Sequence, residues 1–269
     1  MIRLVLSLLL LTGCARRTEP VYVVQPGSVL DRAYTRPTPD PVRARLHVKL
    51  VSKPMGFASG TNAVWISDRP GRGHLAILGP LGGPVATLTS DGVGLSVMLP
   101  QEKRVIAGDD ANANLTAASG SLFDLDALVG LLVGDLPFDD ARITQRTVLE
   151  DGAHFARLAA SNGAEMVLEI EPSMATARHL TLREPTGRVV LAATFEPFEP
   201  MDGGTLVPTR IHVEVPALEL TMDLRFKSWE TLDELPPVFQ RTPPDGWTIE
   251  PIEQALLAWG LKVVPDEHP

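Results

Sequence analysis

The stretch that decides the fold runs from His74 to Pro137. It begins HLAILGPLGGPVATLTSDGVGLSVMLPQEKRVIAG (74–108) and, after a polar segment, ends GSLFDLDALVGLLVGDLP (120–137). The first part is rich in Val, Leu and Ile and is interrupted by Gly-Pro, Asp-Gly and charged turns, a pattern typical of an antiparallel meander. The second part predicts one helix that is apolar over most of its surface and must therefore be covered by other parts of the protein.

Strand patterns continue on both sides of this stretch. From Val42 to Leu50 apolar and polar residues alternate without exception, which predicts a strand at Val42–Val51 with one buried and one solvated face. A second strand is expected at Asn62–Ser67. Beyond the helix we expect strands near Arg142–Glu150, His154–Ala160, Glu165–Glu171, Arg178–Arg183, Arg188–Phe195, Pro208–Val215 and Leu218–Phe226.

The order of these elements predicts a fold class. We expect an α+β fold that is mainly β, a curved antiparallel half-barrel of about 11 to 12 strands. The helix Leu122–Pro137 is expected to cover its concave apolar face. Such an arrangement leaves an apolar space between helix and sheet, and we expect that space to carry the function.

Composition limits the classes of protein. The 269 residues, 44% of them hydrophobic, suffice for one large domain or two small ones. Aromatic residues make up only 5%, so branched aliphatic side chains must build the core. The 33 acidic residues outnumber the 24 basic ones, which argues against nucleic-acid binding because that needs a basic surface.

The N-terminus predicts export and lipidation. One basic residue and an apolar run too short for a permanent membrane span precede Leu11-Thr12-Gly13-Cys14, which resembles a bacterial lipobox. We interpret residues 1–13 as a lipoprotein signal peptide and Cys14 as the lipidated residue. The alternative is an ordinary signal peptide with an incidental cysteine. Because Cys14 is the single cysteine, no disulfide can form within the chain, and the core must hold the domain together.

Two flanking segments differ from the strand-rich part, which spans residues 42–230. Residues 14–41 contain five prolines and predict an extended tether after the lipidated cysteine, with one helical turn at Val29–Tyr34 as the alternative. Residues 231–269 are also rich in proline and predict a C-terminal appendage with a short helix near Pro251–Gly260.

The sequence resembles the LolA/LolB-like superfamily, and within it the outer-membrane lipoprotein receptor of the LolB type. The resemblance rests on the lipobox, the strand-loop-strand Leu75–Leu88 with its Gly79-Pro80-Leu81-Gly82-Gly83 loop, the apolar helix and the strands of Ile211–Trp229. It implies a non-catalytic half-barrel that binds acyl chains, located at the periplasmic face of the outer membrane of a Gram-negative bacterium. Ala15 after the cysteine agrees with that sorting, since an Asp there usually signals retention in the inner membrane. The resemblance also implies that Leu81 is an exposed residue that inserts into the membrane.

Candidate residues follow from these patterns. The expected lining of the acyl-chain pocket is Trp65, Ile77, Leu88, Leu95, Val97, Leu99, Leu125, Val129, Leu132, Val167 and Leu224. The alternative for each of these residues, taken alone, is an ordinary core position without lipid contact. The alternative for Leu81 is a side chain folded back under the sheet. The collective argument is stronger, because so long an apolar face must be filled or hold a ligand.

The sequence offers little support for catalysis. It has no Gly-x-Ser-x-Gly elbow, and its histidines lack zinc-ligand spacing. We therefore expect no enzyme activity, cofactor or metal. The expected partners are acyl chains of lipoproteins or lipids, the membrane through the lipid anchor, and a soluble periplasmic carrier. The alternative function is a non-catalytic scaffold lipoprotein of envelope assembly whose core is filled by its own side chains.

Overall fold

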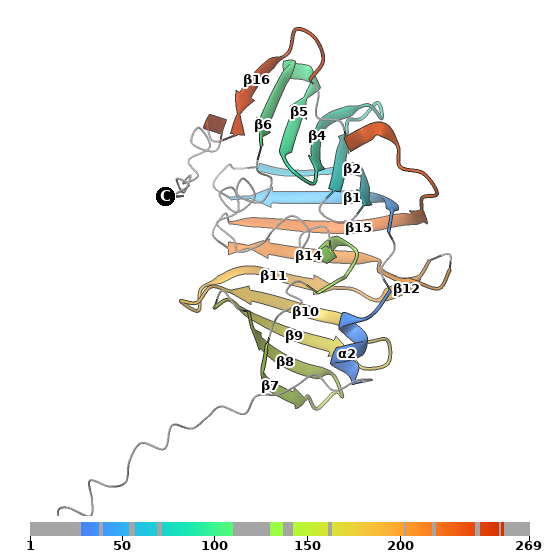
Figure 1. Ribbon diagram of the computed structural model, residues 1–269, viewed down its shortest axis with the longest axis vertical. Coiled ribbons are helices and arrows are strands. Elements are labelled where there is room, and N and C mark those ends of the chain that lie inside the picture. Colours follow the sequence, from blue (N-terminus) through green and yellow to red (C-terminus); the bar gives the residue numbers. More distant parts are fainter. Residues whose placement is uncertain are drawn as a thin grey trace, which may run out of the picture.

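Fourteen strands form one continuous sheet (Figure 1). The computed structural model describes residues 28–37, 40–53, 57–68, 72–109, 130–136, 142–160, 163–201, 203–216, 219–239, 243–252 and 254–255. Within these residues the strand order is β16-β6-β5-β4-β3-β2-β1-β15-β14-β11-β10-β9-β8-β7. Neighbours are antiparallel except β16, which runs parallel to β6. The edge strands β7 and β16 do not pair with each other, so the described sheet is large, curved and unclosed.

Two meanders make up most of the sheet, as the alternating sequence pattern predicts. The first is β1 (Val42–Ser52), β2 (Phe57–Asp68), β3 (Arg72–Leu78), β4 (Pro84–Asp91), β5 (Leu95–Leu99), the 3-10 turn η1 (Pro100–Glu102) and β6 (Arg104–Gly108). The second is β7 (Arg142–Val148), β8 (His154–Ala159), β9 (Glu165–Glu171), β10 (Thr176–Arg183) and β11 (Val189–Phe195).

The last strands join the two meanders. β14 (Arg210–Val215) pairs with β11, and β15 (Leu220–Thr231) lies between β14 and β1. The short strands β12 (Phe198–Pro200) and β13 (Leu206–Pro208) form a separate hairpin. The 3-10 turn η3 (Pro237–Phe239) contacts β3 and β4 before β16 (Thr248–Pro251) completes the edge. The described sheet therefore has fourteen strands, more than the 11 to 12 expected, and one of the additional strands is the short β16, which shows no apolar alternation in the sequence.

The core lies on one face of the sheet. In β1 the apolar members of the alternation, Val42, Ala44, Leu46 and Val48, are buried, while the basic residues between them are more exposed. The same parity recurs in β8, β9, β10, β11 and β14, and the buried residues of all these strands belong to one apolar cluster. Period-two burial thus gives the sheet an apolar inner face and a polar outer face.

A short helix covers one end of the inner face. Helix α2 (Val29–Tyr34) is capped by Ser28, whose Oγ accepts a hydrogen bond from the Asp31 backbone N–H at 3.1 Å. Leu30 and Ala33 of α2 are buried in the core cluster, and the helix contacts β9 (Figure 1). The helical alternative for Val29–Tyr34 is therefore the correct one, and part of the stretch expected to be a tether packs into the domain.

Arg36 ties three segments together just after α2. It donates a hydrogen bond to the Leu206 carbonyl at 2.6 Å and another to the Gly134 carbonyl, and its guanidinium lies 5.0 Å from the ring centre of Phe198. Burial holds the pKa of Arg36 below its usual range. Gly134 has φ +79°, and a Cβ there would meet the Phe198 ring at 2.4 Å, so only glycine fits this contact.

The C-terminal segment also differs from its expected role as an appendage. β16 extends the sheet, and Ile252 and Ala255 are buried in the same core cluster as the strands. Of the expected helix Pro251–Gly260, Pro251 belongs to β16, and Ile252, Gln254 and Ala255 are helical. The rest of it lies outside the described residues.

Candidate functional site

The inner face of β2 to β5 carries a ladder of aliphatic side chains. Pairing places Leu75 opposite Leu88, Leu88 opposite Val97, and Val97 opposite Ile106. In the next row Ala63 faces Ile77, which in turn faces Ala86. Cross-strand pairs of this kind stabilise a sheet and here build a continuous apolar surface.

This surface is covered less completely than the rest of the inner face. Leu75, Ile77, Leu88, Val97 and Leu99 are only partly buried, although all of them pack against the core cluster. By contrast, the equivalent side chains of β8 to β10 are fully buried, including Leu158, Leu168, Ile170 and Leu180. The inner face therefore has a closed half at β8–β10 and an open half at β3–β5. We use these two names below.

Trp65 borders the open half. Its side chain is 4% exposed, and its indole N–H has no hydrogen-bond partner in the described part of the chain. The ring lies against the backbone of Gly73 on the neighbouring strand, where an added Cβ would come within 2.7 Å of Trp65 Cη2. Glycine at this position thus lets the indole lie flat on the sheet.

Gly73→Ala is expected to destabilise the protein by about 1–3 kcal/mol, because the new methyl group forces the indole out of its packed position. Urea unfolding followed by tryptophan fluorescence measures the change. The double variant Gly73→Ala with Trp65→Leu removes the clash and is the matched control. If Gly73→Ala costs as much in the Trp65→Leu background as alone, the contact with the indole is not the cause.

The loop between β3 and β4 presents one apolar side chain to solvent. The Gly79 N–H donates to the Gly83 carbonyl at 2.8 Å, and the Gly82 N–H donates to the Gly79 carbonyl at 2.9 Å. Gly82 has φ +84°, the left-handed conformation that this tight turn needs. Leu81 lies at the tip with 102% relative exposure, so it does not fold back under the sheet.

The expected pocket residues other than Val167 fall into three groups: buried, partly buried, and outside the described residues. Trp65, Leu95 and Leu224 are buried in the core cluster. Partly buried against that cluster are Ile77, Leu88, Val97, Leu99 and Leu132. Leu125, Val129 and the expected lipidation site Cys14 lie outside the described residues.

Val167 does not lie on the inner face, so its assignment to the pocket is wrong. In β9 the buried residues are Met166, Leu168 and Ile170, and Val167 has the opposite parity. Pairing sets it opposite Arg157 and Thr181 on the outer face. An apolar residue type alone does not reveal the face, because β-branched residues also suit the solvated side of a strand.

Sequence reasoning also missed several inward-facing residues. Leu75 has the same parity as Ile77, so the strand alternation could have identified it. Phe226 and Trp229 are stacked with ring centres 4.5 Å apart, and both pack against the core cluster. A bulge between Arg45 and Leu46 shifts the pairing with β15 and brings both rings to the inner face, which alternation along one strand does not predict.

Only the last part of the expected covering helix is described. Gly130–Leu132 are helical, and Leu131 and Leu136 are buried in the core cluster. The described end of this segment therefore contributes two side chains to the core. The remainder of Leu122–Pro137 lies outside the described residues.

The described residues offer no obvious catalytic or metal centre. They contain no group of three or more His, Cys, Asp or Glu side chains that could hold a metal ion. His74 is the one described histidine with a clear pKa shift: burial lowers its pKa, and its Nδ1 lies 2.8 Å from the hydroxyl of Thr89. None of the described helices has the length and hydrophobicity to cross a membrane.

A strongly curved, open antiparallel sheet with an apolar inner face defines the class of this protein. Several solved structures are similar to it. One is a LolA superfamily protein from Nitrosomonas europaea, which has 14% sequence identity and a TM-score of 0.56. The match covers 81% of this chain and 99% of that one. A second is a putative outer membrane lipoprotein-sorting protein domain from Vibrio parahaemolyticus, with 12% identity and a TM-score of 0.53 over 74% of this chain and 88% of that one.

A third similar structure is a DUF1329 family protein from Desulfovibrio piger, with 14% identity and a TM-score of 0.54 over 79% of this chain and 93% of that one. No family model matches the sequence, and no curated protein is significantly similar to it. The chain therefore shares its overall fold with these three proteins.

Proposed function

We propose that this protein is a lipid-anchored periplasmic carrier or receptor that binds acyl chains of lipoproteins or lipids and passes them to the outer membrane. The observation that carries this proposal is the open half of the inner face, where aliphatic side chains remain partly exposed. Apolar surface removed from water contributes roughly 25 cal/mol per Å². An acyl chain lying along this surface would therefore gain free energy without any covalent chemistry.

The fold comparison supports the same class of function. One of the similar structures is described as a putative outer membrane lipoprotein-sorting domain, and another as a LolA superfamily protein. In our proposal Trp65, Ile77, Leu88, Val97 and Leu99 contact the chain. The helix Leu122–Pro137 closes over it, held at its C-terminal end where Arg36 donates to the Gly134 carbonyl.

A fluorescent fatty-acid probe tests the binding step. A variant that begins at Ala15 lacks both the apolar segment Leu4–Leu11 and the cysteine that is expected to be acylated, so any lipid it carries occupies the domain itself. We expect lipid to co-purify with this variant, detected by mass spectrometry, and the probe to bind saturably to the delipidated protein. Absence of both would exclude the carrier function.

The anchor needs its own test, because it is independent of the pocket. In our proposal Cys14 carries the acyl groups, and more than one chain is needed for stable attachment. We expect labelled palmitate to be incorporated in cells by the natural protein and not by Cys14→Ser. We also expect the natural protein to fractionate with the outer membrane. Incorporation into Cys14→Ser would overturn the assignment of Cys14.

The closed half supports the second candidate, an anchored scaffold of envelope assembly with a self-filled core. There Leu158, Leu168 and Ile170 are fully buried, and Leu30 and Ala33 from α2 belong to the same core cluster. If the protein is a scaffold, the fatty-acid probe should not bind saturably. The protein's own side chains should then also fill the space over the open half. The probe measurement therefore separates the two functions.

A further inference from the structure

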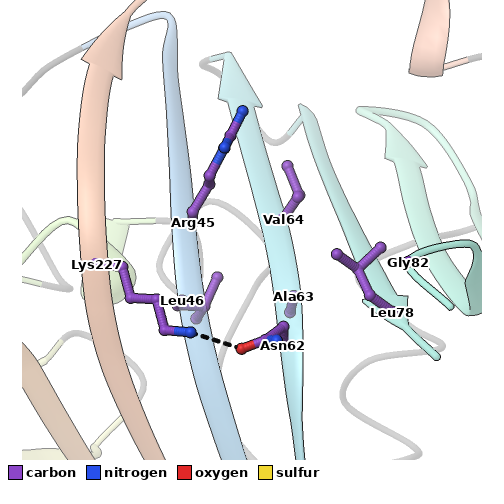
Figure 2. A pocket seen from close by; sticks show the side chains of 8 residues that line it. All are labelled: Arg45, Leu46, Asn62, Ala63, Val64, Leu78, Gly82 and Lys227. Atoms are coloured by element: carbon purple, nitrogen blue, oxygen red, sulfur yellow. Dashed lines mark hydrogen bonds between the residues drawn. The ribbon is translucent and has the colours of Figure 1, made fainter. Parts of the chain in front are cut away.

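A groove lies on the outer face of the sheet beside the Leu81 loop. It has a volume of about 490 Å³ and spans β15, β1, β2 and β3 (Figure 2). Its size falls within the range of about 300–1,000 Å³ that small-ligand sites occupy. It is lined by Arg45, Leu46, Asn62, Ala63, Val64, Leu78, Gly82 and Lys227. Gly82 belongs to the loop that exposes Leu81, so groove and loop tip are adjacent.

Among the described residues, two cations of the groove have no carboxylate partner. Arg45 is exposed, and it forms no ion pair in the part of the chain that the structure describes. The Lys227 ammonium donates to the Asn62 side-chain oxygen at 2.8 Å (Figure 2), which is a neutral partner. Both positive charges are therefore uncompensated at contact distance.

The neighbouring arginines on the same strands are compensated. Arg43 of β1 pairs with Glu230 at 2.6 Å, and Arg225 of β15 pairs with Asp223 at 3.2 Å. Asp223 also accepts hydrogen bonds from Arg210, and this interaction holds the pKa of Asp223 below its usual range. The groove therefore brings two cations that have no carboxylate partner among the described residues into one cavity, in a chain of net charge −9.

The lining is suited to a ligand with both anionic and apolar parts. Val64 and Leu78 supply apolar walls next to the two cations, and the fully exposed Leu81 extends from the adjacent turn. Phosphate oxygens accept hydrogen bonds from guanidinium and ammonium groups, and Arg binds phosphate with two parallel bonds. A membrane has the same two parts: phosphate groups lie at its surface, and hydrocarbon lies below them.

We propose that this groove binds the phosphate groups of anionic phospholipids at the membrane surface while Leu81 enters the acyl layer. The inference rests on the proposed function for the role of Leu81, and it adds a second contact that orients the loop. Attraction of basic side chains to an anionic leaflet weakens as salt rises. The acyl site on the inner face is separate from this contact, since Arg45 and Lys227 point to the outer face.

Vesicle flotation of the variant that begins at Ala15 tests the proposal, because this variant lacks both the apolar signal segment and the lipidated cysteine. We expect stronger binding to phosphatidylcholine vesicles that contain phosphatidylglycerol than to pure phosphatidylcholine vesicles, and a decline in binding as sodium chloride is added. The double variant Arg45→Glu/Lys227→Glu is expected to weaken binding to the anionic vesicles by roughly tenfold or more. Its affinity for the fatty-acid probe is expected to stay unchanged.

Arg142→Glu/Arg146→Glu is the matched control, because it makes the same change in net charge on exposed residues of the edge strand β7 (Figure 1). It is expected to reduce binding much less than the groove variant does. Equal binding to both vesicle types, or equal loss in groove and control variants, would overturn the inference. So would tight binding of polyglutamate without binding to anionic vesicles, which would assign the groove to an acidic protein. If the probe binds while the groove variant has no effect on vesicles, the groove inference fails and the carrier function stands.

Discussion

Leu81→Glu is expected to abolish most of the delivery of bound acyl chains to vesicles while the protein remains folded and loaded. A leucine side chain that enters hydrocarbon contributes about 1.5–3 kcal/mol. A glutamate at the same place must instead carry a charge toward the acyl layer, which costs more. Because Leu81 is fully exposed at the tip of the β3–β4 loop, its replacement removes no packing contact. We expect the free energy of unfolding to change by less than about 0.5 kcal/mol.

The measurement is transfer of a fluorescent fatty acid from the loaded protein to acceptor vesicles. Val93→Glu is the matched control, since Val93 is 71% exposed in the turn between β4 and β5. This control introduces the same charge on an exposed valine at the opposite end of β4 and is expected to transfer at the normal rate. Transfer by Leu81→Glu at the normal rate would show that the loop has no role in delivery.

Substitutions in the two halves of the inner face are expected to separate stability from binding. Leu168 of β9 is 0% exposed in the closed half, and Leu168→Ala should cost about 2–5 kcal/mol of folding free energy. The affinity of the folded fraction for the fatty-acid probe should stay the same. Leu88 of β4 is partly exposed in the open half. Leu88→Glu should lower the probe affinity by roughly tenfold or more, because a carboxylate must lose water beside the acyl chain.

Urea unfolding and probe titration on both variants give the two quantities. Leu88→Gln is the control that keeps the shape of glutamate without its charge, and it should lie between the natural protein and Leu88→Glu in probe affinity. Equal loss of probe affinity in Leu168→Ala and Leu88→Glu, measured on folded protein, would mean that the two halves do not differ in function.

Strand positions were predictable because they depend on local alternation. The strand predicted at Glu165–Glu171 is β9 with the same bounds, and the one predicted from Val42 to Val51 is β1 within one residue. Alternation works here since one face of each strand meets water and the other meets the core. β16 escaped prediction because its four residues form a strand only by pairing with β6.

The candidate site was predictable in part, for the same reason. Parity along β3, β4 and β5 correctly sets Ile77, Leu88 and Val97 on one face, where pairing aligns them. The wrong assignment of Val167 came from residue type without parity. The groove around Arg45 and Lys227 could not be predicted, because its residues are about 180 positions apart in the chain and meet only through the bulged pairing of β1 with β15.

The sequence by itself determined a mainly β chain whose strands each have one apolar face, because side chains alternate along any extended backbone. It also placed Leu81 in a tight turn between two strands, since Pro and Gly surround it. Only the tertiary structure decided which part of the inner face is sealed and which stays open. That outcome depends on where α2, Arg36 and the 130–136 segment pack, and such long-range contacts leave no periodic signal in the chain.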